Sequence, residues 1–446
     1  MALVLGMGAL PVAAQSMALP AADPVGIARS GAQVAYGYSL EAAATNPALL
    51  ASLREKNGFY LSAGLEASST QRSLESNQQT DFSTDRSRGL VAFGLAMRLS
   101  PMLTLGLKLD EPYLRHGKLL DGAPSRFLGD GIDISTHRLE GQAAWALSPN
   151  LSVGLGLGVA RLGYESTSVL RVNVPNSPAL PVSAGNPVEG MVEQRAGQSG
   201  NKIVPSYSLG ARWALNPRWT LGFTHQSGLK GDLDMKAGFR NTNLGYFDNY
   251  GQSPAPIGIQ PRAATLLASS QVVAGGAPLE LPSQTTLGLR HRLTPMMTWE
   301  ADVRWFSASL QVPTFASVQT PSGTVSAPME LPHGRSHFSF NLSSELELGK
   351  FWTLRGGLAF EQRSIDANAA EPLLGGSRTA AFSIGAGYKV WGGELNLGYQ
   401  YRQSEDQDTR RLTGDWTAAG FLATPYNRVR MEGMGHLMAI GFKKTF

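Results

Sequence analysis

Apolar and polar residues alternate one by one along most of the chain from residue 58 onward. In TLGLKL (104–109) the leucines fall on one face of an extended segment, and Thr, Gly and Lys fall on the other. LSVGLGLGV (151–159) repeats the pattern, with Leu and Val opposite Ser and Gly. A period of two residues is typical of β-strands. Eight further segments show it: SYSLGARWAL, WTLGFTHQ, TTLGLRHRL, TWEADVRW, HFSFNLSSELEL, FWTLRGGLAF, AAFSIGAGYKV and ELNLGYQYR.

The connections between these segments are of two alternating kinds. Six short turns contain the Pro, Asn and Gly that tight turns require, near 99–102, 148–150, 216–218, 294–296, 348–351 and 390–393. Seven long loops fall near 70–88, 113–134, 166–202, 230–281, 311–333, 364–377 and 405–432. This alternation predicts fourteen antiparallel strands, with both chain ends on the short-turn side. Short turns on one side, long loops on the other and an even strand number are typical of outer-membrane barrels.

The residues on the outward faces favour a barrel in lipid over a water-soluble stack of sandwiches. A soluble sheet would present Lys and Glu to water, whereas these faces carry Leu, Val, Phe and Trp. A sheet in lipid cannot leave an edge unpaired, so the strands must close. Six of the eight tryptophans also lie near short turns, as an interfacial aromatic girdle would. We therefore predict an all-β transmembrane barrel over residues 58–446.

Composition removes several other classes of protein. Charged residues make up 16% of the chain, and no apolar run approaches the ~20 residues of a membrane helix. Cysteine is absent, which excludes disulfides and thiolate metal sites. The formal net charge is +4, and Lys and Arg are scattered, so nucleic acid is not an expected partner.

Two segments precede the predicted barrel. MALVLGMGALPVAA (1–14) has an apolar run and a small-residue end, which favours the remnant of an export signal over a buried strand. In EAAATNPALLASL (41–53), Asn followed by Pro predicts the cap and first residue of a helix, and so two short helices meeting there. Residues 15–57 are too few for a domain. Because a fourteen-stranded lumen is wide enough to need filling, we predict that they form a plug inside it.

At this point the chain resembles the FadL-type outer-membrane transporters of long-chain fatty acids and hydrocarbons. The most specific residues are GIARSGAQVAY followed by TNPALLASL, in which Asn46, Pro47 and Ala48 match the family's hatch motif. Residues 281–305 and 352–366 resemble later strands, and Phe446 resembles the signal read by the barrel-assembly machinery. The chain departs from the family at Ser364-Ile365-Asp366, at LLGGSR before the next strand and at Lys444. These departures bear on the ligand and not on the fold.

The resemblance implies passive uptake of a hydrophobic small molecule, with long-chain fatty acids as the first expectation and aromatic hydrocarbons as the alternative. The cargo would be captured by outer loops, enter a lumen pocket above the hatch and leave sideways into the bilayer. Burial of each methylene in an apolar phase gains ~0.8 kcal/mol, so an apolar exit suits such a cargo. The expected surroundings are outer-membrane lipid and lipopolysaccharide, with the protein as a monomer.

Site residues follow from the same resemblance. The exit would be a kink in the third strand at Asp110, Glu111, Pro112 and Tyr113, although the strand could equally have reached its loop there. Apolar residues of the two longest loops would capture the cargo, although they could instead pack on one another: Phe239, Leu244, Phe247, Leu266 and Leu267.

A carboxylate cargo would need a cation in the lumen. Arg138 and Arg355 fall on polar, inward faces, where a structural ladder with glutamates such as Glu140 or Glu345 is the competing interpretation. Arg161 is a third candidate, but it is in phase with outward Leu and Val. It marks either the outer headgroup boundary or a bulge that turns it inward.

An outer-membrane hydrolase and an adhesin are the alternatives from other functional classes. The seven histidines are scattered, and the chain contains neither H-E-x-x-H nor G-x-S-x-G. We therefore expect no catalytic residue, no metal site and no cofactor.

Overall fold

The structure of the protein is a computed structural model. It describes residues 18–36, 39–53, 57–74, 80–82, 86–118, 131–173, 191–241, 271–273, 278–312, 317–320, 323–325, 334–365, 376–405, 407–409 and 429–446.

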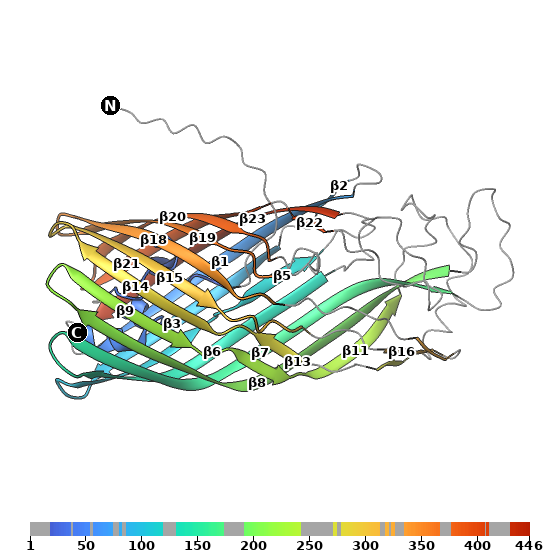
Figure 1. The fold of residues 1–446 in the computed structure, drawn as a ribbon, viewed down its shortest axis with the longest axis horizontal. Helices are drawn as coiled ribbons and strands as arrows, with labels where there is room; N and C mark the ends of the chain where they lie inside the picture. The colour runs from blue at the N-terminus through green and yellow to red at the C-terminus, as the bar shows by residue number, and fades with distance from the viewer. Residues whose placement is uncertain are drawn as a thin grey trace, which may run out of the picture.

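Fourteen antiparallel strands form a closed barrel, which confirms the predicted fold class (Figure 1). The third strand is interrupted and consists of β4 and β5. The first and last strands pair from Gly58 with Thr445 to Leu74 with Val429, and so close the sheet. The wall strands are β1 (Asn57–Leu74), β3 (Arg86–Arg98), β4 (Leu103–Asp110), β5 (Leu114–Lys118), β6 (Gly131–Ala146), β7 (Leu151–Asn173), β8 (Met191–Ala214), β9 (Trp219–Gln226), β14 (Gln284–Arg292), β15 (Met297–Phe306), β18 (His337–Leu348), β19 (Trp352–Glu361), β20 (Thr379–Val390), β21 (Gly393–Ser404) and β23 (Val429–Thr445).

Shorter strands lie at the long-loop end or fold against the wall. They are β2 (Thr80–Phe82), β10 (Leu229–Asp232), β11 (Asp234–Asn241), β12 (Gln271–Val273), β13 (Pro278–Leu281), β16 (Ser317–Thr320), β17 (Gly323–Val325) and β22 (Gln407–Thr409). The C-terminus lies at the opposite end, where the short turns gather (Figure 1).

All six predicted short turns join neighbouring strands of the barrel. In the first of them, the hydroxyl of Ser100 accepts a hydrogen bond from Leu103 N at 3.1 Å, which stabilises a tight reversal. The long loops are shorter than predicted, because the strands beside them extend further than the sequence pattern indicated. β7 continues to Asn173 and β8 begins at Met191, so much of the expected loop 166–202 is strand. Apolar and polar residues no longer alternate regularly in these extensions, although backbone pairing continues to Asn173 with Met191.

The outer surface of the wall is apolar. On β3, Val91, Leu95 and Met97 are 44–49% exposed, whereas Leu90 and Ala92 between and beside them are almost fully buried. Trp213, Trp352 and Trp391, near the short turns, are also exposed. This band is the surface that a lipid bilayer would cover.

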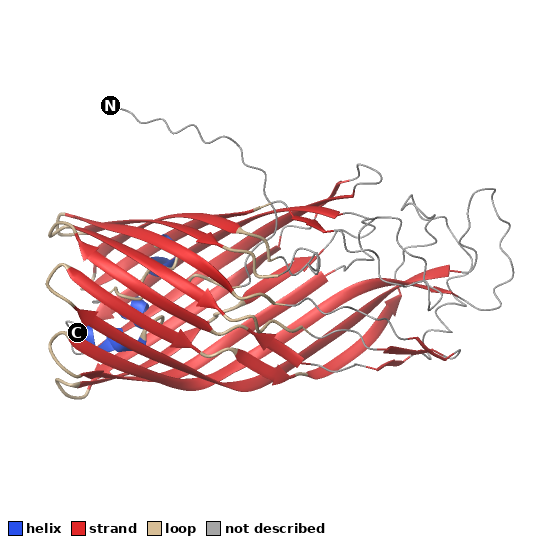
Figure 2. Ribbon diagram, in the orientation of Figure 1, coloured by secondary structure: helices blue, strands red, loops and turns tan. Residues whose placement is uncertain are grey.

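Three short helices precede the barrel: α1 (Pro24–Ala28), α2 (Leu40–Ala43) and the 3₁₀ helix η1 (Pro47–Ser52). They lie inside the barrel near the short-turn end (Figure 2). As predicted, two short helices meet at Asn46, since α2 ends at Ala43 and η1 begins at Pro47. None of the helices in the described ranges is long and apolar enough to cross a membrane. We call described residues 18–53 the N-terminal segment.

Glycines in the wall make room for this segment. A Cβ atom at Gly154, Gly210 or Gly222 would overlap the backbone or side chain of residues 34–48. On β19, a Cβ atom at Gly357 would lie 2.5 Å from the carbonyl carbon of Arg29. At these positions the side chain is absent because another part of the chain occupies its space.

The adjacent glycines of β19 provide a test of this packing. Gly357→Ala should lower the free energy of unfolding by about 1–3 kcal/mol, because the new methyl group overlaps backbone that cannot move aside easily. Gly356→Ala is the matched control, since its Cβ atom would have no neighbour closer than 3.8 Å. Urea unfolding of both variants in detergent measures the difference. Equal stability of the two variants would contradict close packing at Gly357.

Candidate functional site

Buried carboxylates of β15 hold the N-terminal segment in the lumen. Glu300 accepts a hydrogen bond from Ala35 N at 2.7 Å and forms an ion pair with Arg29 at 2.7 Å. Asp302 Oδ2 accepts from the backbone amides of Gln33 at 2.9 Å and Val34 at 3.1 Å. Charge-assisted bonds of this kind are the stronger ones in proteins, so these contacts anchor residues 29–35.

A second group of contacts surrounds Tyr36. Its hydroxyl donates to both carboxylate oxygens of Glu345, at 2.7 and 2.6 Å. The guanidinium of Arg29 lies over its ring, 4.0 Å from the centroid, and also faces Glu345 at 3.8 Å. Arg355 forms an ion pair with the same glutamate at 2.7 Å.

The Asn46-Pro47-Ala48 motif is buried and bridges the segment to the wall. The side-chain oxygen of Asn46 accepts from Ala48 N at 3.1 Å, which caps η1. Its amide nitrogen donates to the carbonyl oxygens of Val34 at 2.8 Å and Ala211 at 3.1 Å. The motif is therefore both a helix boundary and a tether between the segment and β8.

The predicted lumen cations have different environments. Arg138 forms a two-pronged ion pair with Asp110, at 2.9 and 2.6 Å. Arg355 binds Glu345 and, at 2.9 Å, Glu394. Both thus take part in an internal ladder.

The lumen position expected for Arg161 is wrong. This residue is exposed, whereas Ala160 and Leu162 on either side of it are fully buried. It follows the outward phase of β7, so the local alternation was the better guide.

A small cavity lies beside the N-terminal segment, and one of the arginines that line it, Arg304, was not predicted from the sequence. Its volume of about 50 Å³ is room for a few water molecules. Arg138 and Arg304 both line it. Within the described residues, the buried Nε of Arg304 has no hydrogen-bond partner, and its Nη2 donates to Gly31 O at 3.4 Å. Arg304 alternates in phase with Glu300 and Asp302 along the strand, and this pattern could have identified it as a residue of the lumen.

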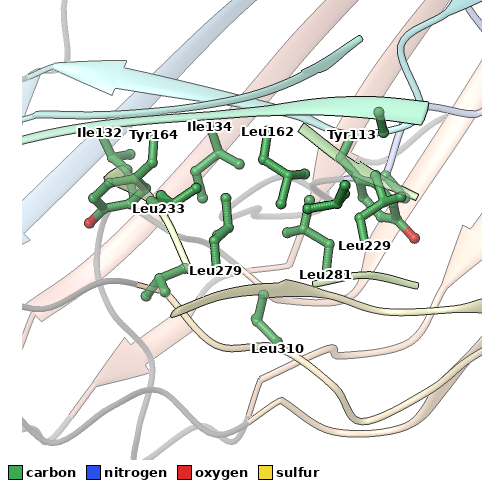
Figure 3. Close-up of a cluster of buried hydrophobic side chains, with 14 of the residues drawn as sticks. Tyr113, Ile132, Ile134, Leu162, Tyr164, Leu229, Leu233, Leu279, Leu281 and Leu310 are labelled. Carbon is green, nitrogen blue, oxygen red and sulfur yellow. The ribbon is translucent and has the colours of Figure 1, made fainter. Parts of the chain in front are cut away.

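A large group of apolar side chains also faces the lumen, and we call it the apolar cluster (Figure 3). The strands β10 and β13 pair as a ribbon, and Leu279 and Leu281 point toward Ile134 and Leu162 of the wall. Sequence reasoning assigned residues 230–281 to one outer loop and so missed this lining. The cluster comprises Ala18, Tyr113, Ile132, Ile134, Ala160, Leu162, Tyr164, Val204, Leu229, Leu233, Leu279, Leu281, Phe306, Leu310, Val312 and Ile365.

The wall is interrupted at residues 110–113. β3 and β4 pair up to Phe93 with Leu109, and no ladder between β3 and β5 occurs among the described pairings. Against β6, residues 111–113 stand opposite only two residues, since Asp110 pairs with Arg138 and Leu114 with Ser135. This extra residue is a β-bulge, and Pro112 cannot donate to a ladder. The third strand therefore bends here and resumes as β5.

Two polar side-chain contacts connect the two sides of this wall break. His116 of β5 lies 3.2 Å from Glu66 of β1. Arg88 of β3 reaches Asp133 of β6 at 2.7 Å. Both contacts skip a strand in the wall order, and the first three residues of β5, Leu114, Arg115 and His116, are all buried. The residues of the bulge also contribute to the cavity and to the apolar cluster. Pro112 lines the cavity, and Tyr113 belongs to the apolar cluster.

The remaining predicted site residues are the apolar loop residues and Phe446. Leu244, Phe247, Leu266 and Leu267 lie outside the described residues. Phe239 falls in β11, but its side chain lies outside the description. Phe446 is exposed, and its backbone pairs with Asn57 where the barrel closes.

The closed wall, its apolar outer band and its short turns at one end define an integral outer-membrane β-barrel. The chain belongs to the outer membrane protein transport protein family (OMPP1/FadL/TodX), whose model matches residues 6–446. It is thus an outer-membrane transporter of hydrophobic compounds.

Solved structures show the same fold. A FadL homologue from Pseudomonas aeruginosa superposes with a TM-score of 0.73 at 16% identity, covering 97% of this chain and 100% of that one. The toluene transporter TodX from P. putida has a TM-score of 0.62 at 14% identity, with 95% and 98% covered. The toluene transporter TbuX from Ralstonia pickettii has a TM-score of 0.59 at 14% identity, with the same coverage. None of the curated proteins compared with the chain matches it significantly.

We expect the stability of the fold to depend on pH through Asp23 of the N-terminal segment. Its carboxylate caps α1 by accepting from Gly26 N at 2.7 Å. Burial, reinforced by nearby Glu41, raises the pKa of Asp23 from 3.8 to about 6. Because the raised pKa favours the protonated form in the fold, stability decreases as the pH rises from about 4 through 6.

Asp23→Asn should therefore stabilise the protein at pH 7.5 by up to roughly 3 kcal/mol and have little effect at pH 4. Asparagine keeps the capping oxygen without the buried charge. Urea unfolding at the two pH values measures the effect, with the exposed Asp234→Asn as control. A gain that is the same at both pH values would exclude ionisation of Asp23 as its cause.

Proposed function

We propose that the protein carries long-chain fatty acids across the outer membrane. The observation that supports this most directly is the position of the apolar cluster next to a cavity that Arg304 and Arg138 line, together with Asp23, Asp110 and Glu111. Gln284 lines the cavity and donates to the hydroxyl of Tyr113 in the cluster at 2.9 Å. An alkyl chain would lie in the cluster, and a carboxylate would face Arg304 and Arg138. The cavity, at about 50 Å³, is too small to hold an alkyl chain. Binding would therefore require the side chains of the apolar cluster to move apart.

Aromatic hydrocarbons are the second candidate cargo. TodX and TbuX are both named as toluene transporters, and the apolar cluster would suit toluene as well as an alkyl chain. The distinguishing feature is Arg304, because a hydrocarbon gains nothing from a cation with an unused donor. The family's description as transport proteins supports transport over hydrolysis or adhesion.

Uptake by cells that express or lack the protein distinguishes these cargoes. Fatty-acid uptake should be saturable, and excess toluene should inhibit it only weakly. Arg304→Gln should raise the half-saturation concentration for fatty acid by about tenfold or more, because a charge-assisted hydrogen bond is lost. Toluene uptake should not change, and Arg304→Lys should restore part of the fatty-acid affinity.

Arg161→Gln is the matched control, since this arginine is exposed on the outer face. Heat-modifiable gel migration verifies that every variant folds. Toluene uptake that is saturable, with no protein-dependent uptake of fatty acid, would replace the first cargo by the second.

We further propose that the cargo leaves sideways through the wall break. The N-terminal segment, within the predicted plug of residues 15–57, occupies the lumen at the short-turn end and so obstructs a direct route to the periplasm. The cavity, the apolar cluster and the break all meet at residues 110–113. The expected roles of residues 1–14 as an export-signal remnant and of Phe446 as an assembly signal belong to the same proposal.

A crosslink across the break tests the exit. The chain has no cysteine, so Arg88→Cys/Asp133→Cys places one reactive pair across it. Closing this pair with a short bis-maleimide should lower uptake toward that of cells lacking the protein, because β3 and β6 can no longer separate. The uncrosslinked double variant serves as the reference for loss of the ion pair.

Leu139→Cys/Val159→Cys is the control pair. These residues pair directly across β6 and β7, where the ladder is continuous, and both are exposed. Crosslinking them should leave uptake unchanged. Full uptake with a crosslinked break would reject the lateral exit while leaving the cargo assignment intact.

A further inference from the structure

A basic pocket lies at the short-turn end of the barrel, away from the cavity and the apolar cluster. It has a volume of about 420 Å³ and is lined by residues of the turns before β7 and β9 and of the strands β8, β9 and β14. Four of its lining residues are arginines: Arg212, Arg218, Arg290 and Arg292. The other lining residues are uncharged, and they include Asn150, Asn216 and Thr220.

The strand register explains why these arginines converge. Thr220 of β9 pairs with Ala214 of β8 on one side and with Arg290 of β14 on the other. Arg212 and Arg290 are therefore on strands about 10 Å apart and both face inward, each only 8% exposed. Arg292 N donates to Arg218 O at 2.8 Å, which brings the backbones of the other two arginines together at the rim.

The positive charge of this pocket is large compared with the net charge of the whole protein. Four guanidinium groups gather here, in a protein whose formal net charge is only +4. Like charges around one concave surface repel one another and raise the local concentration of anions. The nearby carboxylate of Glu300 is bound by Arg29 and by Ala35 N, each at 2.7 Å, and it also interacts electrostatically with Arg290. Arg290 also lies over the ring of Tyr36, at 5.2 Å from the centroid.

We propose that this pocket binds a small, soluble anion carrying at least two phosphate or carboxylate groups, which reaches it from the periplasm. Arginine forks match the oxygens of such groups, and the inner and rim pairs would each hold one group. The small and polar remaining lining offers little contact to an alkyl chain. The site thus differs in chemistry from the cargo route and does not depend on the identity of the cargo.

Calorimetric titration of the full chain in neutral detergent tests the proposal, with inorganic pyrophosphate as the probe. We expect one saturable site that weakens as salt is added and that binds pyrophosphate more tightly than phosphate. Arg218→Gln/Arg292→Gln at the exposed rim should weaken binding about tenfold or more without disturbing the fold. Arg161→Gln, on the outer face of the barrel, should bind like the unmodified protein.

Several results would overturn the site. These are the absence of saturable heat at low salt, equal binding by the rim double variant, or equal affinity for phosphate and pyrophosphate. A short-chain phosphatidic acid is titrated in parallel. Tighter binding of this lipid than of pyrophosphate would replace the soluble anion by a lipid headgroup.

Discussion

The need to pair every backbone hydrogen-bonding group inside lipid is the constraint on which the rest of this structure depends. It requires the first strand to meet the last, as β1 and β23 do over seventeen residue pairs. It also makes any interruption of the ladder costly, so the bulge at Asp110–Tyr113 stands out. There Arg88 of β3, which pairs with Glu66 of β1 but with no residue of β5 among the described pairings, reaches Asp133 of β6.

Closure creates a lumen, and the chain fills part of that lumen with its own N-terminal segment. Small residues in the wall and charged residues pointing inward act together here. Glycines such as Gly357 let the backbone approach, and Glu300 and Asp302 then bind its amide groups. Buried charges are tolerated because nearly all of those described have partners, as Arg29 and Arg355 do. Arg304 also has partners, but its Nε forms no hydrogen bond in the part of the chain that the structure describes, and the residue lines a cavity.

The same inward face therefore has three chemical zones. Near the long loops it is apolar, where β10 and β13 fold against β6 and β7. In the middle it is polar and paired, with Arg304 and Arg138 beside the cavity. At the short-turn end it is basic, around Arg212 and Arg290. The proposed fatty-acid cargo would occupy the first two zones together, and the proposed compact anion would occupy the third.

The sequence by itself determined the barrel, its six short turns and the helix boundary at Asn46, because alternation, turn residues and capping act between neighbours in the chain. It also indicated that the third strand would be disturbed near Pro112. Only the tertiary structure brought Arg88 to Asp133, folded Leu279 and Leu281 against Ile134, and left Arg304 facing a cavity. The outward position of Arg161, by contrast, agrees with its phase in the sequence. The physical reason is that these contacts join residues far apart in the chain, and the pairing of strands around a closed sheet decides which of them meet.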